Sequence, residues 1–244
     1  MTDPAPTSAP VPEKAGIWED FIDIFYQPSA VFDRRRAGQF GLALLLLVVA
    51  TTVLFFALRN GLAPMIDAEL SKAVAGIAEK NPQMTAEQLA SSKSMMEKFS
   101  VFGVVVFIPI GVLITAVVLW AVGRLVDAKI AFAAAMMIAT YAQFPRLAET
   151  ILNALQGLLL PPEAITSRYS VTLGPARFLD PDTVGPFLMT LIGGLDVFTI
   201  WVTVLLAIGL SVVGRIPVAR AAIAAAAVWL VTLLPQLFGA LSQG

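Results

Sequence analysis

Residues 39–58 read QFGLALLLLVVATTVLFFAL, twenty residues without a charge. A helix of that length is about 30 Å long, which is the thickness of the hydrocarbon core of a bilayer. Such a run is typical of a transmembrane helix. We therefore predict an all-α integral membrane protein whose membrane domain covers residues 37–240. Four further apolar stretches complete a predicted five-helix transmembrane bundle, at about residues 99–122, 130–158, 187–213 and 216–238.

The composition supports a membrane protein and excludes most enzyme classes. Hydrophobic residues make up 58% of the chain and charged residues 14%, against roughly 45–50% and about 25% in soluble domains. Cysteine and histidine are both absent, which excludes disulfides, thiolate nucleophiles and histidine-based triads or zinc sites. The formal charge of -1 provides no basic excess for nucleic acid. We expect no enzymatic activity, catalytic residue, metal or cofactor, and no nucleic-acid partner.

The residues before the first predicted span divide into two parts. Residues 1–15 combine four prolines with small and polar residues, which predicts a disordered tail. Residues 16–36 place apolar side chains at helical spacing among acidic ones, and this predicts a cytoplasmic amphipathic segment in the headgroup layer. A helix packed on the membrane spans is the alternative. The predicted cytoplasmic anchor consists of Trp18, Phe21, Pro28, Phe32, Arg34, Arg35 and Arg36.

Basic residues near the span ends predict the orientation, because cytoplasmic loops are enriched in lysine and arginine. The outer loop at 59–98 has five basic and five acidic residues, and the other outer loop, at 159–186, is also mixed. We therefore predict a cytoplasmic N-terminus and an extracytoplasmic C-terminus. The basic residues on the predicted cytoplasmic side are the three anchor arginines and Arg124, Lys129, Arg215 and Arg220.

The two outer loops are expected to be folded. In the first, Asn81-Pro82 interrupts a helical pattern, and Thr85 with Gln88 forms a capping-box pattern that opens a helix running into the second span. This predicts an extracytoplasmic helical hairpin. In the second loop, the stretches around Tyr169 and Phe178, separated by Gly174-Pro175, predict two short strands around a turn.

Polar residues inside the third and fourth spans form a predicted intramembrane polar cluster. On a helix, Arg146, Glu149, Asn153 and Gln156 share one face, and Pro145 predicts a bend just before it. Because a charge at the bilayer centre costs about 3 kcal/mol, this face needs a polar partner. Asp196, Thr199 and Thr203 provide a matching face on the fourth span.

We expect Arg146 to bridge Glu149 and Asp196 between these two spans. Two readings of the cluster remain open: a buried pairing that fixes helix packing, and a functional site for protons, ions or lipid headgroups. The segment Gly193-Gly-Leu-Asp196 lacks the second glycine of the intramembrane aspartyl protease motif, so it does not support that activity.

Two segments resemble the Yip (Ypt-interacting protein) family. They are IWEDFIDIFYQPSAVFD at residues 17–33 and LDVFTIW at residues 195–201, which continues to LAIGL at residues 206–210. The resemblance implies a non-enzymatic membrane protein with five spans and a cytoplasmic N-terminus. The segment at residues 17–33 resembles the bacterial branch of the family, and the alanine- and leucine-rich spans with the proline-rich tail fit a bacterial inner-membrane protein. The hairpin departs from the short loop of eukaryotic members, whose Rab GTPase partners are therefore not carried over.

The sequence is compatible with two functions. The first is a scaffold or accessory subunit for membrane transport or trafficking machinery, which binds other membrane proteins through helix faces and the outer hairpin. The second is a small-molecule, ion or lipid transporter that uses the Arg146, Glu149 and Asp196 cluster. Five spans contain no evident inverted repeat, so a transporter would need a homo-oligomer. Membrane lipid, other membrane proteins and a second copy of the chain are the expected partners.

Overall fold

The computed structural model describes residues 16–180 and 183–241, and within these residues every regular element is a helix. The predicted all-α fold is confirmed. The predicted disordered tail lies outside the described residues. The α-helices are α1 (Ile17–Tyr26), α2 (Pro28–Arg34), α3 (Gly41–Ala57), α4 (Arg59–Lys80), α5 (Ala86–Leu125), α6 (Phe132–Ala142), α7 (Pro145–Leu159), α8 (Pro186–Gly193), α9 (Val197–Gly214) and α10 (Val218–Leu241).

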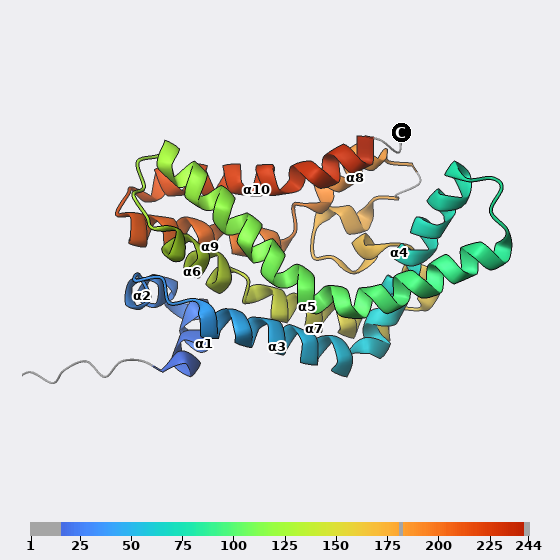
Figure 1. Ribbon diagram of the computed structural model, residues 1–244, viewed down its shortest axis with the longest axis horizontal. Coiled ribbons are helices and arrows are strands. Elements are labelled where there is room, and N and C mark those ends of the chain that lie inside the picture. Colours follow the sequence, from blue (N-terminus) through green and yellow to red (C-terminus); the bar gives the residue numbers. More distant parts are fainter. Residues whose placement is uncertain (1–15, 181–182, 242–244) are drawn as a thin grey trace, which may run out of the picture.

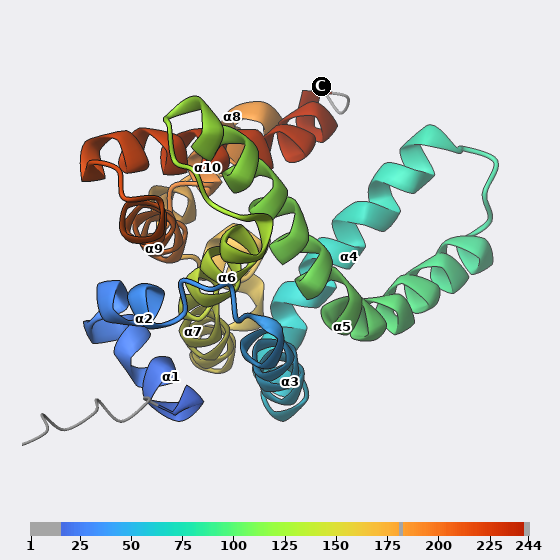
Figure 2. The ribbon, with the colours of Figure 1, turned by 60° about the vertical axis from the view of Figure 1, so that its left-hand side comes forward.

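Helix α6 lies at the centre of the bundle. Residues 134–142 are all buried, as expected for a helix that is apolar on every side. Helices α2, α3, α5 and α9 surround α6 (Figure 2). Small side chains allow this close approach: a Cβ atom on Gly209 of α9 would lie 2.6 Å from the Ile138 side chain.

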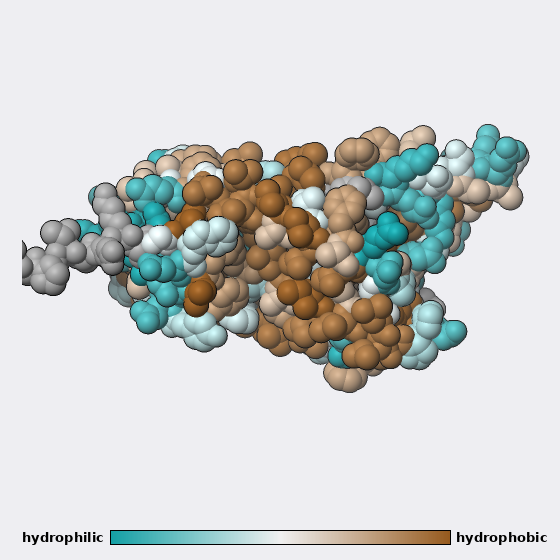
Figure 3. All heavy atoms as spheres, turned by 90° about the horizontal axis from the view of Figure 1, so that it is seen from below, coloured by the Kyte–Doolittle hydropathy of each residue, from teal (hydrophilic) through white to brown (hydrophobic). Residues whose placement is uncertain are grey.

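The outer surface of the bundle is apolar. Seen from below, apolar side chains form a broad band between polar side chains at the two ends of the molecule (Figure 3). Large exposed side chains on α5 include Phe107, Leu113 and Val117, which are 70%, 45% and 45% exposed. Exposed apolar area on this scale is typical of a surface that faces lipid or another protein. The molecule is an integral membrane protein.

Within the described residues, three helical segments are long and apolar enough to cross a membrane: Val105–Leu125 of α5, α9 and α10. A fourth is possible if α3 and α4 form one span, although they meet at 89°. The third and fourth predicted spans are not continuous helices. The third divides into α6 and α7, and the fourth into α8 and α9. A bundle of five spans therefore stays a prediction.

The predicted helical hairpin is confirmed. Helix α4 and the first part of α5 extend away from the bundle (Figures 1 and 2). The amide of Gln88 donates to Thr85 Oγ1 at 3.3 Å and the amide of Thr85 donates to Gln88 Oε1 at 2.9 Å, which is the predicted capping box. The base of the hairpin touches α7 directly, because a Cβ atom on Gly157 would lie 1.8 Å from the carbonyl oxygen of Gly61.

The two strands predicted in the second outer loop are wrong. The loop forms three short 3₁₀ helices: η1 (Pro162–Ala164), η2 (Arg168–Val171) and η3 (Pro175–Phe178). Prolines occupy the first position of η1 and η3, where their fixed φ favours a helical turn. Ser167 caps η2 by accepting a hydrogen bond from the Tyr169 amide at 3.3 Å. These local signals outweigh the short alternation of apolar and polar residues.

Candidate functional site

A polar cavity of about 380 Å³ lies between α7, α9 and α10 and is bordered by η2, α8 and the base of α4. We call it the polar cavity. Five of the seven residues of the predicted cluster line it, drawn from both predicted helices. They are Arg146, Glu149, Asn153, Asp196 and Thr199.

Arg146 occupies the first turn of α7, directly after the break from α6. At this break, the amide of Phe144 donates to the carbonyl oxygen of Tyr141 at 3.3 Å. The amide of Arg146 donates to the carbonyl oxygen of Gln143 at 2.9 Å. These i to i+3 bonds tighten the turn where Pro145 has no amide hydrogen to donate. The bend predicted from Pro145 therefore exists as a break between two helices.

The Arg146 side chain joins α7 to α9. Its Nη1 lies 2.7 Å from Glu149 Oε2, and its Nη2 donates to Thr199 Oγ1 at 3.1 Å. The Arg146 and Glu149 side chains are 38% and 19% exposed. The predicted ion pair with Glu149 is thus present, and the contact with the fourth predicted span is made through a threonine hydroxyl.

The expected ion pair between Arg146 and Asp196 is wrong. Asp196 is the N-cap of α9, and its Oδ1 accepts hydrogen bonds from the amides of Phe198 at 2.7 Å and Thr199 at 2.8 Å. A carboxylate at this position satisfies amides that have no partner inside the helix. Thr199 Oγ1 lies 3.3 Å from Asp196 Oδ2 and therefore connects the two charged groups.

Two residues of the predicted cluster point elsewhere. Gln156 Nε2 donates to the carbonyl of Val171 at 2.6 Å and ties α7 to η2. The hydroxyl of Thr203 donates to the carbonyl of Thr199 within α9 at 2.8 Å. Neither side chain lines the polar cavity. Helical periodicity therefore predicts which face of each helix carries the site, but it does not predict where along the helix the site ends.

The sequence did not identify the cavity residues from η2 and α10. Arg168 Nη2 donates to Tyr169 Oη at 2.9 Å and to Gln236 Oε1 at 3.4 Å, and its guanidinium lies 4.9 Å from the centre of the Tyr169 ring. Trp229 of α10 lines another part of the wall. The sequence shows Arg168 next to Tyr169 in an outer loop. A loop has no helical spacing from which a shared face could be predicted, so these residues could not be assigned to the cavity.

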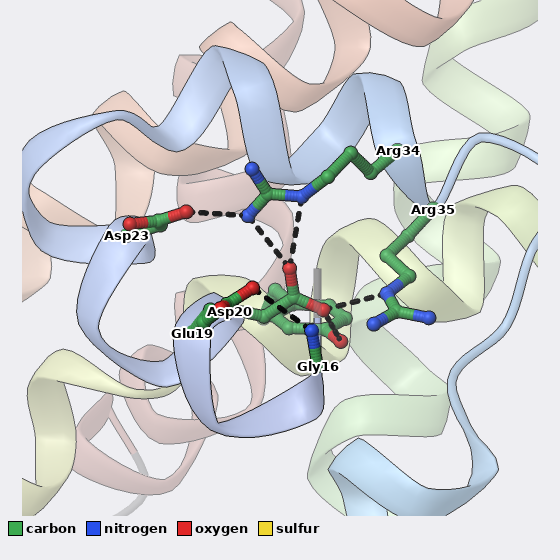
Figure 4. A network of polar contacts seen from close by, with 7 residues as sticks. Gly16, Glu19, Asp20, Asp23, Arg34 and Arg35 are labelled. Carbon is green, nitrogen blue, oxygen red and sulfur yellow. Dashed lines mark hydrogen bonds and ion pairs between the residues drawn. The ribbon is translucent and has the colours of Figure 1, made fainter. Parts of the chain in front are cut away.

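A second polar cluster lies at the N-terminal end, around the fully buried carboxylate of Asp20 (Figure 4). Arg34 Nη2 lies 2.8 Å from Asp20 Oδ1, and Arg35 Nε lies 2.6 Å from Asp20 Oδ2. The Tyr141 hydroxyl of α6 donates to Oδ2 at 3.2 Å. One carboxylate therefore holds α1, α2 and the centre of the bundle together.

The predicted anchor residues divide between this cluster and the core. Phe32 is fully buried, and Phe21 packs edge-on against Phe144 with ring centres 4.4 Å apart. Trp18 is 70% exposed. Pro28 begins α2. The segment packs on the bundle, which is the alternative given above to a helix lying freely in the headgroup layer.

The arginines of the anchor have different roles. Arg34 also binds Asp23 at 2.6 Å, whereas Arg36 pairs with Asp33 on the same short segment. Burial alone would lower the pKa of Arg34, but its hydrogen bonds to Asp20 and Asp23 raise that pKa above its ordinary value. Arg34 therefore remains a cation, as a partner of the buried carboxylate must.

The chain matches the Yip1 domain over residues 22–239. It belongs to the Yip1 domain family. The matched region of this Yip1 domain protein begins within α1 and ends within α10, so it contains every residue named above as lining the polar cavity. It also contains Arg34, Arg35 and Tyr141, whereas Asp20 precedes it by two residues.

No curated protein and no solved structure matches the chain significantly. Yip1 domain proteins are known as non-enzymatic membrane proteins. Within residues 16–180 and 183–241, no group of three or more acidic, histidine or cysteine side chains is arranged to hold a metal ion. The arrangement offers hydrogen bonding and charge pairing in the polar cavity, together with contacts at the apolar surface.

Proposed function

We propose that this Yip1 domain protein is a non-enzymatic scaffold or accessory subunit for membrane transport or trafficking machinery. Its contacts would be made through exposed helix faces in the membrane and through the α4–α5 hairpin outside it. The observation that carries the proposal is the hairpin, an ordered structure that extends from the bundle (Figure 1) and has exposed side chains along both of its helices.

Polar contacts join the two helices of the hairpin and tie α4 to the second outer loop. Lys93 Nζ lies 2.6 Å from Asp67 Oδ1 and 3.2 Å from Ser71 Oγ. The amide of Arg168 donates to Glu69 at 2.8 Å and ties α4 to the second outer loop. An exposed ion pair contributes at most about 1 kcal/mol, so these contacts orient the hairpin and leave its outer faces available to another protein.

The α5 surface adds a second contact area. Residues 86–104 precede the apolar segment of α5 and correspond to about 28 Å of helix. Phe99 and Phe102 lie near the junction and are 67% and 70% exposed. In the apolar segment Val105–Leu125, only 17% is buried inside the molecule. Lipid, a partner helix or a second copy of the chain can therefore pack along this segment.

The orientation belongs to the same proposal. Helices α1 and α2 and the basic turns at residues 124–129 and 215–220 lie at one end of the molecule, opposite the hairpin and the end of α10 (Figure 1). The positive-inside rule places that end in the cytoplasm. We propose a bacterial inner membrane, with the hairpin on the extracytoplasmic side.

Single cysteines test both parts of the proposal, because the chain has none of its own. Ser94→Cys places a thiol on the hairpin, and Ser29→Cys places one on α2; both sites are exposed. In intact cells, an impermeant maleimide should label position 94 and not position 29. A short cross-linker at position 94 should give one adduct of defined mass. Reversed labelling contradicts the orientation, and the absence of an adduct contradicts the scaffold role.

A second candidate function is transport of a small molecule, ion or lipid through the polar cavity. The observation that favours it is the placement of the cavity beside two helix breaks, since interrupted helices line many transport sites. Purified protein in liposomes tests it. Flux of protons or solute that is lost in Asp196→Asn would replace the scaffold with a transporter, and such a transporter would be expected to form a homo-oligomer.

A further inference from the structure

We propose that the polar cavity binds a zwitterionic ligand with a phosphate group at one end and a primary ammonium group at the other, the chemistry of phosphoethanolamine. The ligand could be a lipid headgroup or a soluble molecule. The proposal goes beyond the scaffold role and does not require transport, because it concerns occupancy of the cavity alone.

The charges of the cavity require a ligand with both signs. Its lining contains two arginines and two carboxylates, so it has no net charge. Arg146 and Glu149 pair with each other. Among the residues that the structure describes, Arg168 has no carboxylate and Asp196 has no basic side chain within ion-pair distance. A simple anion would compensate only the arginine, and a simple cation only the aspartate.

Asp196 is suited to the ammonium end. It is only 6% exposed, and a buried carboxylate without a cation is costly. Its Oδ1 is occupied by two amides of α9, whereas Oδ2 has a single partner, the Thr199 hydroxyl at 3.3 Å. Oδ2 therefore keeps the capacity to accept from an ammonium group.

An aromatic side chain lines the same cavity as this carboxylate. Trp229 lines the cavity and approaches the chain two residues before Asp196, where a Cβ atom on Gly194 would lie 3.3 Å from the indole. An indole face attracts a cation through the negative charge of its π system. A cavity lined by both a carboxylate and an indole is thus a suitable environment for an ammonium group.

Arg168 is suited to the phosphate end. Its guanidinium is held by the Tyr169 ring at 4.9 Å and the Tyr169 hydroxyl at 2.9 Å. That tyrosine can occupy its position only because Gly193 has no side chain, since a Cβ atom there would lie 2.2 Å from the ring. Both fixed contacts involve neutral groups, and a guanidinium has further donors that match the oxygens of a phosphate.

The size of the cavity agrees with such a ligand. A volume of about 380 Å³ lies within the range of about 300–1,000 Å³ of small-molecule sites. The lining combines Asn153, Thr172, Thr190 and Thr232 with the aromatic side chains. These neutral polar groups can contact the ester oxygens between the two charged ends.

The experiment measures ligand binding to the full chain in detergent, by native mass spectrometry and by thermal stabilisation. The probes are short-chain phosphatidylethanolamine, phosphatidylglycerol, phosphatidylcholine and soluble O-phosphoethanolamine. Phosphatidylethanolamine should bind about tenfold more tightly than phosphatidylglycerol, which has no ammonium group, and than phosphatidylcholine, whose trimethylated nitrogen cannot donate a hydrogen bond. Binding of O-phosphoethanolamine at equal affinity supports the proposal with a soluble ligand as the source, and its absence supports a lipid source.

Two variants connect this binding to the cavity. Asp196→Asn removes the charge but keeps an oxygen that can cap α9, and Arg168→Gln keeps the backbone contact to Glu69. Each should weaken phosphatidylethanolamine binding about tenfold without changing the melting temperature of the ligand-free protein. Glu163→Gln and Arg177→Gln are the matched controls, because both lie in the same outer loop but do not line the cavity; they should bind normally.

Three results would overturn the proposal. The first is equal binding of phosphatidylethanolamine and phosphatidylglycerol, which would mean that the ammonium group is not recognised. The second is unchanged binding in both cavity variants, which would mean that the lipid sits on the outer surface. The third is no binding of any probe to a protein that melts cooperatively.

Discussion

Replacing Asp20 with asparagine should weaken the attachment of α1 and α2 to the bundle. The carboxylate is fully buried and accepts from Arg34, Arg35 and Tyr141 at 2.6–3.2 Å. Removing one partner of a buried ion pair costs about 3–5 kcal/mol. The two arginine side chains remain 30% and 22% exposed and can regain water, so we expect a loss near the lower limit, about 3 kcal/mol. In a chain of this size, that is a fall in melting temperature of about 6–12 °C.

Thermal unfolding of the purified protein in detergent measures the effect, and Asp33→Asn is the control. Asp33 pairs with Arg36 at the surface, so its loss should cost less than about 1 kcal/mol. Tyr141→Phe removes one hydrogen bond to Asp20 and should cost about 1 kcal/mol alone but much less in the Asp20→Asn background. If Asp20→Asn melts no lower than Asp33→Asn, the carboxylate does not hold the segment to the bundle.

Three further substitutions test the packing and capping described above. Gly157→Ala forces its Cβ atom toward the carbonyl oxygen of Gly61, 1.8 Å away without movement, and should increase proteolysis at the base of the hairpin. Thr85→Ala removes the N-cap of α5 and should cost about 1 kcal/mol, seen as faster hydrogen exchange in the first turn of that helix. Gly193→Ala displaces the Tyr169 ring, whose nearest atom is 2.2 Å from the added Cβ, and should change tyrosine fluorescence and weaken ligand binding.

Gly76→Ala is the control for both glycine substitutions, because a Cβ atom there meets no heavy atom within 4 Å. It lies inside α4, where alanine should stabilise the helix by roughly 0.5–1 kcal/mol. If Gly157→Ala or Gly193→Ala behaves like this control, the neighbouring element can move aside and the close approach is not required.

Hydropathy predicted the helical fold, but it could not predict where the helices are interrupted. The break after α6 follows from Pro145, which has no amide hydrogen and was visible in the sequence. The break before α9 was missed, because the apolar stretch from 187 to 213 is continuous in hydropathy. The sequence signal for this break is Asp196 after Gly193 and Gly194, since an aspartate before an apolar run is a preferred N-cap and indicates the start of a helix.

The cavity residues that lie on one face of a single helix were predicted from their spacing. Arg146, Glu149 and Asn153 line one cavity because residues three and four apart share a helix face. Arg168 and Trp229 could not be predicted, because their position depends on how the second outer loop folds over the bundle. The burial of Asp20 was likewise invisible, since an acidic residue among apolar ones is usually the solvated side of an amphipathic helix.

The position of Asp196 links structure and proposed binding through a single carboxylate. A helix that begins inside a membrane protein leaves amides without partners, and Oδ1 of Asp196 satisfies two of them. The same side chain lines the cavity, and its Oδ2 has a single hydrogen-bond partner, the Thr199 hydroxyl. A neutral asparagine retains the capping function and loses the charge, whereas alanine loses both. The difference between Asp196→Ala and Asp196→Asn in melting temperature therefore measures the cap, and the difference between Asp196→Asn and the unchanged protein in ligand affinity measures the charge. If the Asp196→Asn variant melts at as low a temperature as the Asp196→Ala variant, the negative charge is required for folding and the cap alone is not sufficient.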